Sequence, residues 1–250
     1  MIIDSHVHLH TFGDEVTASV DRAVKYADRM GIEKLVVSLG SQLRRQPTAE
    51  ELIEDNEYVM RGVQHNPDRI VGLVYASPNH VETSLQLMKR YIENGPMRGV
   101  KMWICRHCSD PANDPIAEYA GQLDVPIQQH TWIKSTGNYP TESTPWDLLK
   151  LARRHPDTSF IMAHSGGNWE KGIRIVKDQP NISIDVCGGN PEVGQTEYGV
   201  EYLGAQRVLY GSDAAGRSFA SQLAKVIGAD ISDADRRMIL EENARRMFHL

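Results

Sequence analysis

The sequence predicts a (β/α)8 TIM barrel, an α/β fold in which residues 1–250 form a single domain. Eight short apolar runs alternate with stretches of helical periodicity, and polar residues gather at the ends of those runs. The length of 250 residues is also typical of one such barrel. A doubly wound open sheet uses the same units and is the alternative, but eight regular units exceed what most open sheets of this length contain.

Apolar, β-branched runs give the predicted strands, and amphipathic stretches fill the intervals. The strands are expected at residues 2–9, 34–39, 70–76, 99–104, 126–131, 160–166, 182–187 and 208–213. In the first interval, residues 19–31, Val20, Val24 and Ala27 form one apolar stripe. Gly31 then supplies a typical helix stop, so a helix is predicted here.

Capping patterns mark the predicted start of two further helices. Residues 48–64 begin with Thr48 and carry Glu51 three positions on, which is a capping-box pattern. Residues 232–248, near the end of the chain, begin with a similar capping pattern. By contrast, residues 131–145 are rich in Gly, Pro, Ser and Thr and predict a long loop after the fifth strand.

Composition excludes several classes of protein. The net charge of −6 argues against a general nucleic-acid or membrane-surface binder, which would present a basic face. Three cysteines, an odd number, fit a reducing compartment better than a disulfide framework. The polar pattern of Asp4, His6 and His8 begins too close to Met1 for a signal peptide, and no window offers the roughly 18 apolar residues of a membrane span. We therefore expect a soluble cytoplasmic protein.

Polar residues of metal-ligand type fall at the ends of the predicted strands. His6 and His8 lie on the first, His130 on the fifth, His164 on the sixth and Asp213 on the eighth. In a barrel of this kind the carboxyl ends of the strands form the active site. Because five such residues are hard to explain as satisfied core residues, the set indicates a metal centre.

The first strand carries the most direct signal. His6 and His8 are two positions apart, so both project to the same face of the strand. Neutral imidazoles placed in this way reach one divalent ion at about 2.1 Å each. Asp4 shares that face one step deeper and is better placed to orient a ligand than to be one.

Other candidates have plainer interpretations. Surface positions in helices or turns are expected for His65, His80, His155 and His249. His10 either lines the mouth of the pocket or points to solvent. Cys105 and Cys108 lack the second ligand pair of a structural zinc site, and Cys187 is expected as a small buried apolar residue. Residues that follow strand ends and are expected to clasp an aromatic or carboxylated ligand are Trp103, Arg106, Trp132, Trp169 and Arg217.

The order of motifs along the whole chain resembles the amidohydrolase superfamily. The motifs are DSHVH (4–8), GVK (99–101), PIQQH (126–130), FIMAHSGG (160–167), VLYGSD (208–213) and ENARRMF (242–248). The likeness is to the amidohydrolase-related branch, which includes the aminocarboxymuconate-semialdehyde decarboxylases. It implies a distorted (β/α)8 barrel of the metal-dependent hydrolase type, with one or two divalent ions at its mouth.

The resemblance also implies roles for individual residues. His6, His8 and His130 would be metal ligands, and Asp213 a ligand or proton acceptor. His164 would be the catalytic histidine beside the metal. Lys101 stands where some amidohydrolases carry a carbamylated lysine between two metals, and the alternative is a lysine that lines the pocket and binds an acidic group of the substrate. Zinc is the expected metal, with manganese as the alternative.

The leading expectation is hydrolysis of a C–N or C–O bond, in an amide, lactone or cyclic ester of a small acidic molecule, by a metal-activated water. Non-oxidative decarboxylation of a small unsaturated or aromatic carboxylic acid is the runner-up. A phosphoesterase of the polymerase-and-histidinol-phosphatase type would need further ligands, and a catalytically inactive binding barrel would predict a broken ligand set. The expected partner is a small-molecule substrate, with a homodimer possible and neither nucleic acid nor membrane involved.

Overall fold

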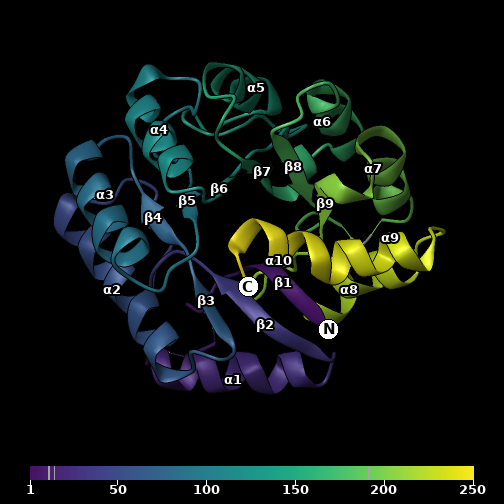
Figure 1. Ribbon diagram of the computed structural model, residues 1–250, viewed down its shortest axis with the longest axis horizontal. Helices are drawn as coiled ribbons and strands as arrows, with labels where there is room; N and C mark the ends of the chain where they lie inside the picture. The colour runs from purple at the N-terminus through teal and green to yellow at the C-terminus, as the bar shows by residue number, and fades with distance from the viewer. Residues whose placement is uncertain (11, 14, 191) are drawn as a thin grey trace.

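The computed structural model describes residues 1–10, 12–13, 15–190 and 192–250, and its strands close into the predicted barrel (Figure 1). All neighbouring strands are parallel. In chain order they are β1 (Ile2–Val7), β2 (Ile32–Val37), β3 (Ile70–Gly72), β4 (Val74–Ala76), β5 (Val100–Met102), β6 (Ile127–Gln129), β7 (Phe160–Met162), β8 (Ile182–Asp185) and β9 (Val208–Leu209).

Two junctions turn these strands into a closed ring. The predicted strand 70–76 is divided at Leu73, whose N–H bonds back to Val37 on β2, while the next N–H bonds forward to Gly99 beside β5. At the other junction, Ser5 donates to the main-chain oxygen of Tyr210 at 3.0 Å, which joins β1 to the end of β9. Because both seams are hydrogen-bonded, the barrel is confirmed and the open sheet is excluded.

Ten helices cover the barrel in the described residues. They are α1 (Val16–Asp28), α2 (Ala49–His65), α3 (Val81–Met88), α4 (Asp114–Gln122), α5 (Pro145–Arg154), α6 (Trp169–Val176), α7 (Gln195–Leu203), α8 (Phe219–Ile227), α9 (Asp233–Arg237) and α10 (Asn243–Phe248). Thr48 and Glu51 form the predicted capping box of α2. The predicted helix 232–248 is interrupted by a π-helical turn at Met238–Glu242, between α9 and α10.

Several predicted strands are too long at their carboxyl ends. The strand expected at 160–166 ends at Met162, and residues 163–166 form a short turn instead. The strand expected at 208–213 ends at Leu209. These segments leave the ladder early because they bend over the barrel mouth, where they carry His164 and Asp213.

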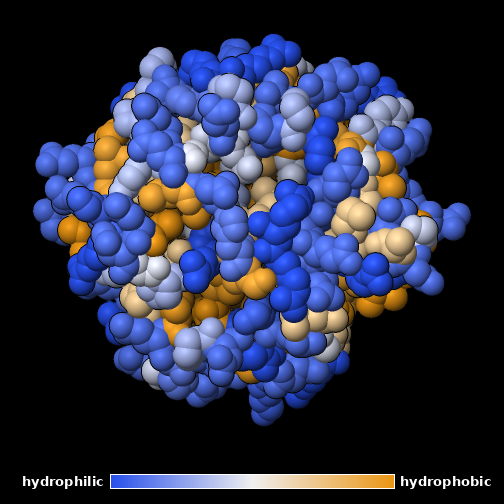
Figure 2. All heavy atoms as spheres, in the orientation of Figure 1, coloured by the Kyte–Doolittle hydropathy of each residue, from blue (hydrophilic) through white to orange (hydrophobic). Residues whose placement is uncertain are grey.

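The opposite end of the barrel is closed by the C-terminal helix. Met247 and Phe248 of α10 pack with Ile3, Val36 and Leu209 in an apolar cluster at the strands' amino ends. Figure 1 shows α10 and the chain's C-terminus in the centre of the ring, beside β1. On the same face hydrophilic residues predominate, and apolar ones show mainly in the hollows (Figure 2). Within the described residues, no helix combines the length and apolar character that a membrane span needs.

Candidate metal centre and active site

Strand β1 and the residue that follows it bring two histidine side chains together. The Nε2 atoms of His6 and His8 lie 3.2 Å apart, and both side chains are buried. His8 Nδ1 lies 3.0 Å from the main-chain oxygen of Ser38, which can only accept, so this nitrogen carries the proton and Nε2 presents its lone pair. Asp4 accepts the main-chain N–H groups of His6 and Ser212, so it positions the backbone that carries His6.

Asp213 completes this first cluster. Its Oδ1 lies 3.5 Å from His8 Nε2 and 3.9 Å from His6 Nε2. Its backbone is left-handed, with φ 58°, which is a costly conformation for a residue other than glycine. Its side chain is 18% exposed, so the cluster reaches the surface here. We call His6, His8 and Asp213, with these three atoms, the outer cluster.

Lys101, from β5, lies beside the outer cluster. Its Nζ is 2.9 Å from His6 Nε2 and donates to Gln128 Oε1 at 3.1 Å. The ammonium thus occupies the same lone pair of His6 that a bound cation would use. A cation in the outer cluster therefore requires Lys101 to give up this contact.

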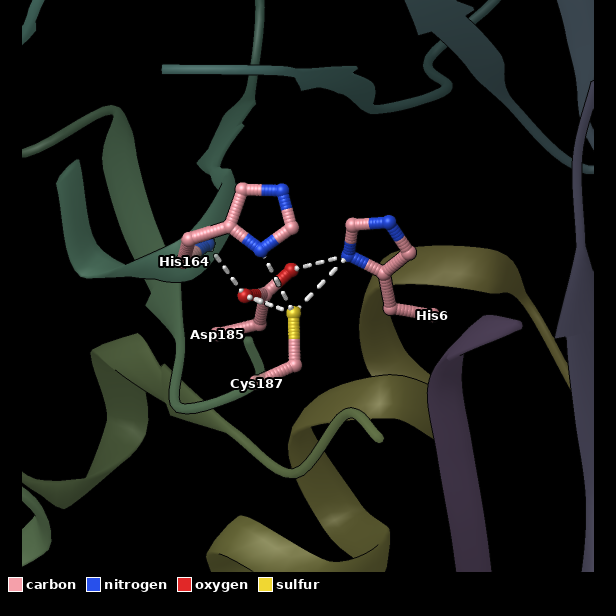
Figure 3. A group of neighbouring side chains, drawn as sticks. All are labelled: His6, His164, Asp185 and Cys187. Carbon is pink, nitrogen blue, oxygen red and sulfur yellow. Dashed lines mark hydrogen bonds and ion pairs between the residues drawn. The ribbon is translucent and has the colours of Figure 1, made fainter. Parts of the chain in front are cut away.

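Behind the outer cluster lies a second group of side chains (Figure 3). Asp185, at the end of β8, accepts from His6 Nδ1 at 2.9 Å and from the main-chain N–H of His164 at 2.7 Å. Cys187 Sγ donates at 2.8 Å to Asp185 Oδ1, the oxygen that also accepts the His164 N–H, and lies 3.1 Å from His6 Nδ1 and 3.3 Å from His164 Nδ1. We call His6, His164, Asp185 and Cys187 the inner cluster.

His130 stands on the far side of His164. Its Nδ1 lies 3.2 Å from His164 Nε2, and its Nε2 lies 2.9 Å from Glu142, which also binds Lys134. In the described part of the chain His130 belongs to neither group of converging metal-ligand atoms. Its role as a metal ligand stays a prediction, because it requires one of these two contacts to be exchanged for the metal.

The predicted substrate-binding residues divide into two sets. Trp132 stacks on His130 with a centroid separation of 6.1 Å and lies 4.9 Å from the ring of His164, and Trp103 meets His130 edge-on. Arg106 instead binds Asn79 and Asp110 at the exposed surface.

Two more of the predicted residues also lie away from the histidines. Arg217 lines a separate cavity of about 320 Å³ with Phe12 and Tyr26. Trp169 donates to Glu192. His10 lies 6.1 Å from the ring of His8, and its buried Nδ1 has no partner among the described residues, so it stands at the edge of the site.

Burial and neighbouring charges shift the pKa values of the site. Burial lowers the pKa of His6 to about 4 and that of His164 well below the usual range. Burial alone would raise the pKa of Asp213 and Asp185, but hydrogen bonds and charges from the histidines outweigh it and lower both. Burial lowers the pKa of Lys101 to about 8. Near neutral pH His6 and His164 are thus neutral beside two ionised carboxylates, which is the protonation state that metal binding requires.

Sequence reasoning missed Asp185 and Glu142. Asp185 ends the apolar run ISID, and a carboxylate at the carboxyl end of a strand was the signal that singled out Asp213. Glu142 lies in the 131–145 loop, where nothing local marks it. Cys187 was expected as a small buried apolar residue; it is buried, but its thiol contacts three polar side chains.

Comparisons with known proteins agree with this architecture. Residues 3–250 match the protein family described as amidohydrolase. A curated relative, 2-amino-3-carboxymuconate-6-semialdehyde decarboxylase of Dictyostelium discoideum, is 23% identical over 162 residues. That alignment spans 57% of this chain and 45% of the relative, less than half its length.

Solved structures share the fold at low sequence identity. The 2,6-dihydroxybenzoate decarboxylase from Rhizobium matches with a TM-score of 0.81 and 17% identity, over 99% of this chain and 98% of that one. A dihydroxybenzoic acid decarboxylase from Polaromonas sp. JS666, solved with bound manganese and the inhibitor 2-nitroresorcinol, matches with a TM-score of 0.76 and 19% identity, over 92% of this chain and 86% of that one. At these identities the likeness establishes the (β/α)8 fold.

Proposed function

The chain belongs to the amidohydrolase family, and from this premise we propose that it is a metal-dependent decarboxylase of a small aromatic or unsaturated carboxylic acid. The similar proteins named above are decarboxylases of such acids, which favours this reaction over hydrolysis. Hydrolysis of an amide or lactone, the leading expectation from sequence, stays a prediction that the same assays would test.

One observation carries the proposal of a metal. The lone pairs of His6 Nε2 and His8 Nε2 face each other across 3.2 Å, and Asp213 Oδ1 faces the same point. Two acceptors this close repel unless positive charge lies beside them, and here Lys101 supplies such charge to His6 Nε2. Donors around a divalent ion at about 2.1 Å each are spaced about 3–4 Å apart, so the outer cluster fits such an ion.

The remaining groups fit the chemistry of carboxylate loss. A divalent cation in the outer cluster would bind the substrate's oxygens and draw electron density from the bond that breaks. Decarboxylation replaces a C–C bond with a C–H bond as CO₂ leaves, so one proton must reach that carbon. His164 is our candidate for relaying this proton from solvent to the carbon, because its ring lies 5.0 Å from that of His6 at the edge of the outer cluster. Trp132 and Trp103 would flank an aromatic ring, and Lys101, released from His6, would bind a carboxylate.

The donor set suits more than one metal. Imidazole nitrogen favours Zn²⁺ and a carboxylate is compatible with Mn²⁺, so we propose zinc first and manganese as the alternative. Elemental mass spectrometry of protein purified without chelator would identify the ion. His8→Ala and Asp213→Asn should each lose the outer ion and reduce turnover at least 1000-fold with an unchanged circular dichroism spectrum. His65→Ala, which removes a surface histidine paired with Asp21, is the matched control and should change neither.

The reaction class is tested on a panel of hydroxybenzoates, carboxylated phenols and unsaturated dicarboxylic acids, with amides and lactones of similar size alongside. Release of CO₂ that depends on the metal would support the proposal. Ring opening or amide cleavage without CO₂ would replace it with the hydrolase. Metal-independent turnover in the His8→Ala protein would refute both.

A further inference from the structure

We propose that this chain carries a second metal site, distinct from the outer cluster, for a thiophilic divalent cation such as Zn²⁺. The inference goes beyond the proposed function, because its ligand atoms are not those assigned to the catalytic ion. The four donors are the members of the inner cluster: His6 Nδ1, His164 Nδ1, an oxygen of Asp185 and Cys187 Sγ (Figure 3).

The geometry of the inner cluster is close to that of a four-coordinate site. Cys187 Sγ lies 3.1 Å and 3.3 Å from the two imidazole nitrogens and 2.8 Å from Asp185 Oδ1. His6 Nδ1 lies 2.9 Å from Asp185 Oδ2. Ligands of a tetrahedral zinc ion lie about 3.3–3.6 Å apart, given Zn–N near 2.1 Å and Zn–S near 2.3 Å. The donors therefore need to separate by about half an ångström, which side-chain torsions can supply.

The inner cluster faces the opposite edge of the His6 ring from the outer cluster. His6 directs Nε2 toward His8 and Asp213, and Nδ1 toward Cys187. Strand β8 supplies Asp185, and Cys187 follows two positions on. An ion in the inner cluster thus shares only one residue, His6, with the outer cluster, and uses a different atom of it.

The charge and proton balance favour such an ion. Asp185 and Cys187 are buried at 0% and 1% exposure, and an ionised carboxylate at such burial needs a cation or hydrogen-bond donors beside it. Binding of the cation displaces the thiol proton of Cys187, and the Nδ1 proton of His6 moves to Nε2, where it replaces the contact from Lys101. A thiolate and a carboxylate then neutralise the two charges of the cation, leaving a buried site of zero net charge when both histidines are neutral. With the outer cluster also filled, His6 bridges the two ions as an imidazolate.

The backbone around the inner cluster is shaped to bring these donors together. His164 adopts φ 61° and Ser165 φ 46°, left-handed conformations that are strained in residues other than glycine. Gly188, next to Cys187, has φ 68°, and a Cβ there would stand 2.4 Å from His164 Nδ1. Lys225 holds this segment through the main-chain oxygens of residues 186 and 188. These left-handed residues thus lie next to the contact between His164 and Cys187.

Cobalt titration tests the site, because a thiolate ligand gives Co²⁺ an intense charge-transfer absorption in the near ultraviolet that nitrogen and oxygen ligands lack. We expect two equivalents of Co²⁺ in the wild type, one of them producing this band. Cys187→Ser should bind one equivalent without the band. Cys108→Ser, at another fully buried cysteine, is the matched control and should keep both. A wild type without the band, or a band that survives Cys187→Ser, overturns the proposal.

Two measurements keep this test separate from the proposed function. His8→Ala should lose the outer ion but keep the thiolate band; loss of the band would mean that Cys187 ligates the outer ion, and would overturn a separate site. X-ray absorption on the zinc-loaded wild type requires no variant and should show sulfur at about 2.3 Å for part of the zinc. Zinc with only nitrogen and oxygen neighbours would overturn the inner site, whatever the enzyme's activity.

Discussion

A methyl group added at Gly188 should displace His164. Comparison with the same change at Gly189 then separates the effect of backbone strain from the effect of a misplaced His164. Gly188 has φ 68°, and a Cβ there would stand 2.4 Å from His164 Nδ1 and 3.0 Å from its Cγ. Its neighbour Gly189 has φ 57°, but a Cβ there meets no atom of the described residues within 4 Å. The pair Gly188→Ala and Gly189→Ala therefore shares the strain, and only the first carries the clash.

The magnitudes follow from this geometry. Left-handed φ costs alanine about 1–2 kcal/mol at either position. At Gly188 the imidazole must also retreat by about 1 Å to reach ordinary contact distance, and overpacking of this kind adds about 1–3 kcal/mol. A displacement of about 1 Å in a reacting group can reduce turnover about 100-fold. We expect Gly189→Ala to keep turnover within about threefold of wild type and Gly188→Ala to lose about two orders of magnitude.

Thermal unfolding and turnover of the metal-loaded proteins, measured side by side, provide the assay. The additional clash predicts that Gly188→Ala melts about 2–10 °C below Gly189→Ala. Restoring space with His164→Ala in the Gly188→Ala protein should recover the melting temperature but not turnover. Equal turnover in the two glycine variants would refute the reasoning, because it would mean that the position of His164 does not matter to the reaction.

Three more substitutions test other parts of the molecule. Burial raises the pKa of Asp4 to about 7, so the folded protein favours the protonated carboxyl and loses stability as pH rises from about 4 to 7. The Asp4→Asn variant lacks this titration, so in chelator its unfolding free energy relative to wild type should rise with pH by up to about 4 kcal/mol. A difference that does not change with pH would contradict this. Lys225→Met leaves the main-chain oxygen of Gly188 and the side chain of Gln195 without their buried donor, and should lower stability by about 1–3 kcal/mol in urea titrations and slow turnover. Leu148 is a fully buried residue of α5, and Leu148→Ala should lower the unfolding free energy by about 2–5 kcal/mol and leave kcat unchanged. A fall in kcat would show that this helix is coupled to the site.

Periodicity predicted the order of strands and helices because burial imposes it locally. The strands lie within apolar, β-branched runs of the sequence, and Thr48 and Glu51 form the predicted capping box of α2. The carboxyl ends of strands were beyond this reasoning. His164 and Asp213 leave the ladder with left-handed φ, and neither is a glycine that would have announced the turn. The surrounding contacts hold these conformations, and such contacts have no signature in a single sequence.

The part of the candidate site that could be predicted consists of polar residues at the ends of predicted strands. His6, His8 and Asp213 converge as their positions suggested, and Lys101 lies against them. Arg106 and Arg217 also follow strands, yet they turn away, because loop direction and not strand position decides where a long side chain points. Cys187 is buried as predicted, but its polar surroundings were missed, because His6 and His164 reach it from segments distant in sequence.

The charge distribution connects the two clusters to the proposed chemistry. Asp185 and Asp213 have lowered pKa values and remain ionised, while Lys101, with its pKa near 8, is the cation in contact with His6. Without a metal, Asp185, Asp213 and Lys101 together carry one net negative charge, which opposes entry of a carboxylate substrate. One divalent ion in the outer cluster reverses that sign and frees Lys101 from His6 Nε2. Metal-free protein should therefore bind a substrate-like benzoate at least 100-fold more weakly than loaded protein in calorimetry, and Lys101→Met should weaken binding to the loaded form while strengthening retention of the ion. Equal benzoate affinity with and without metal would refute this electrostatic account.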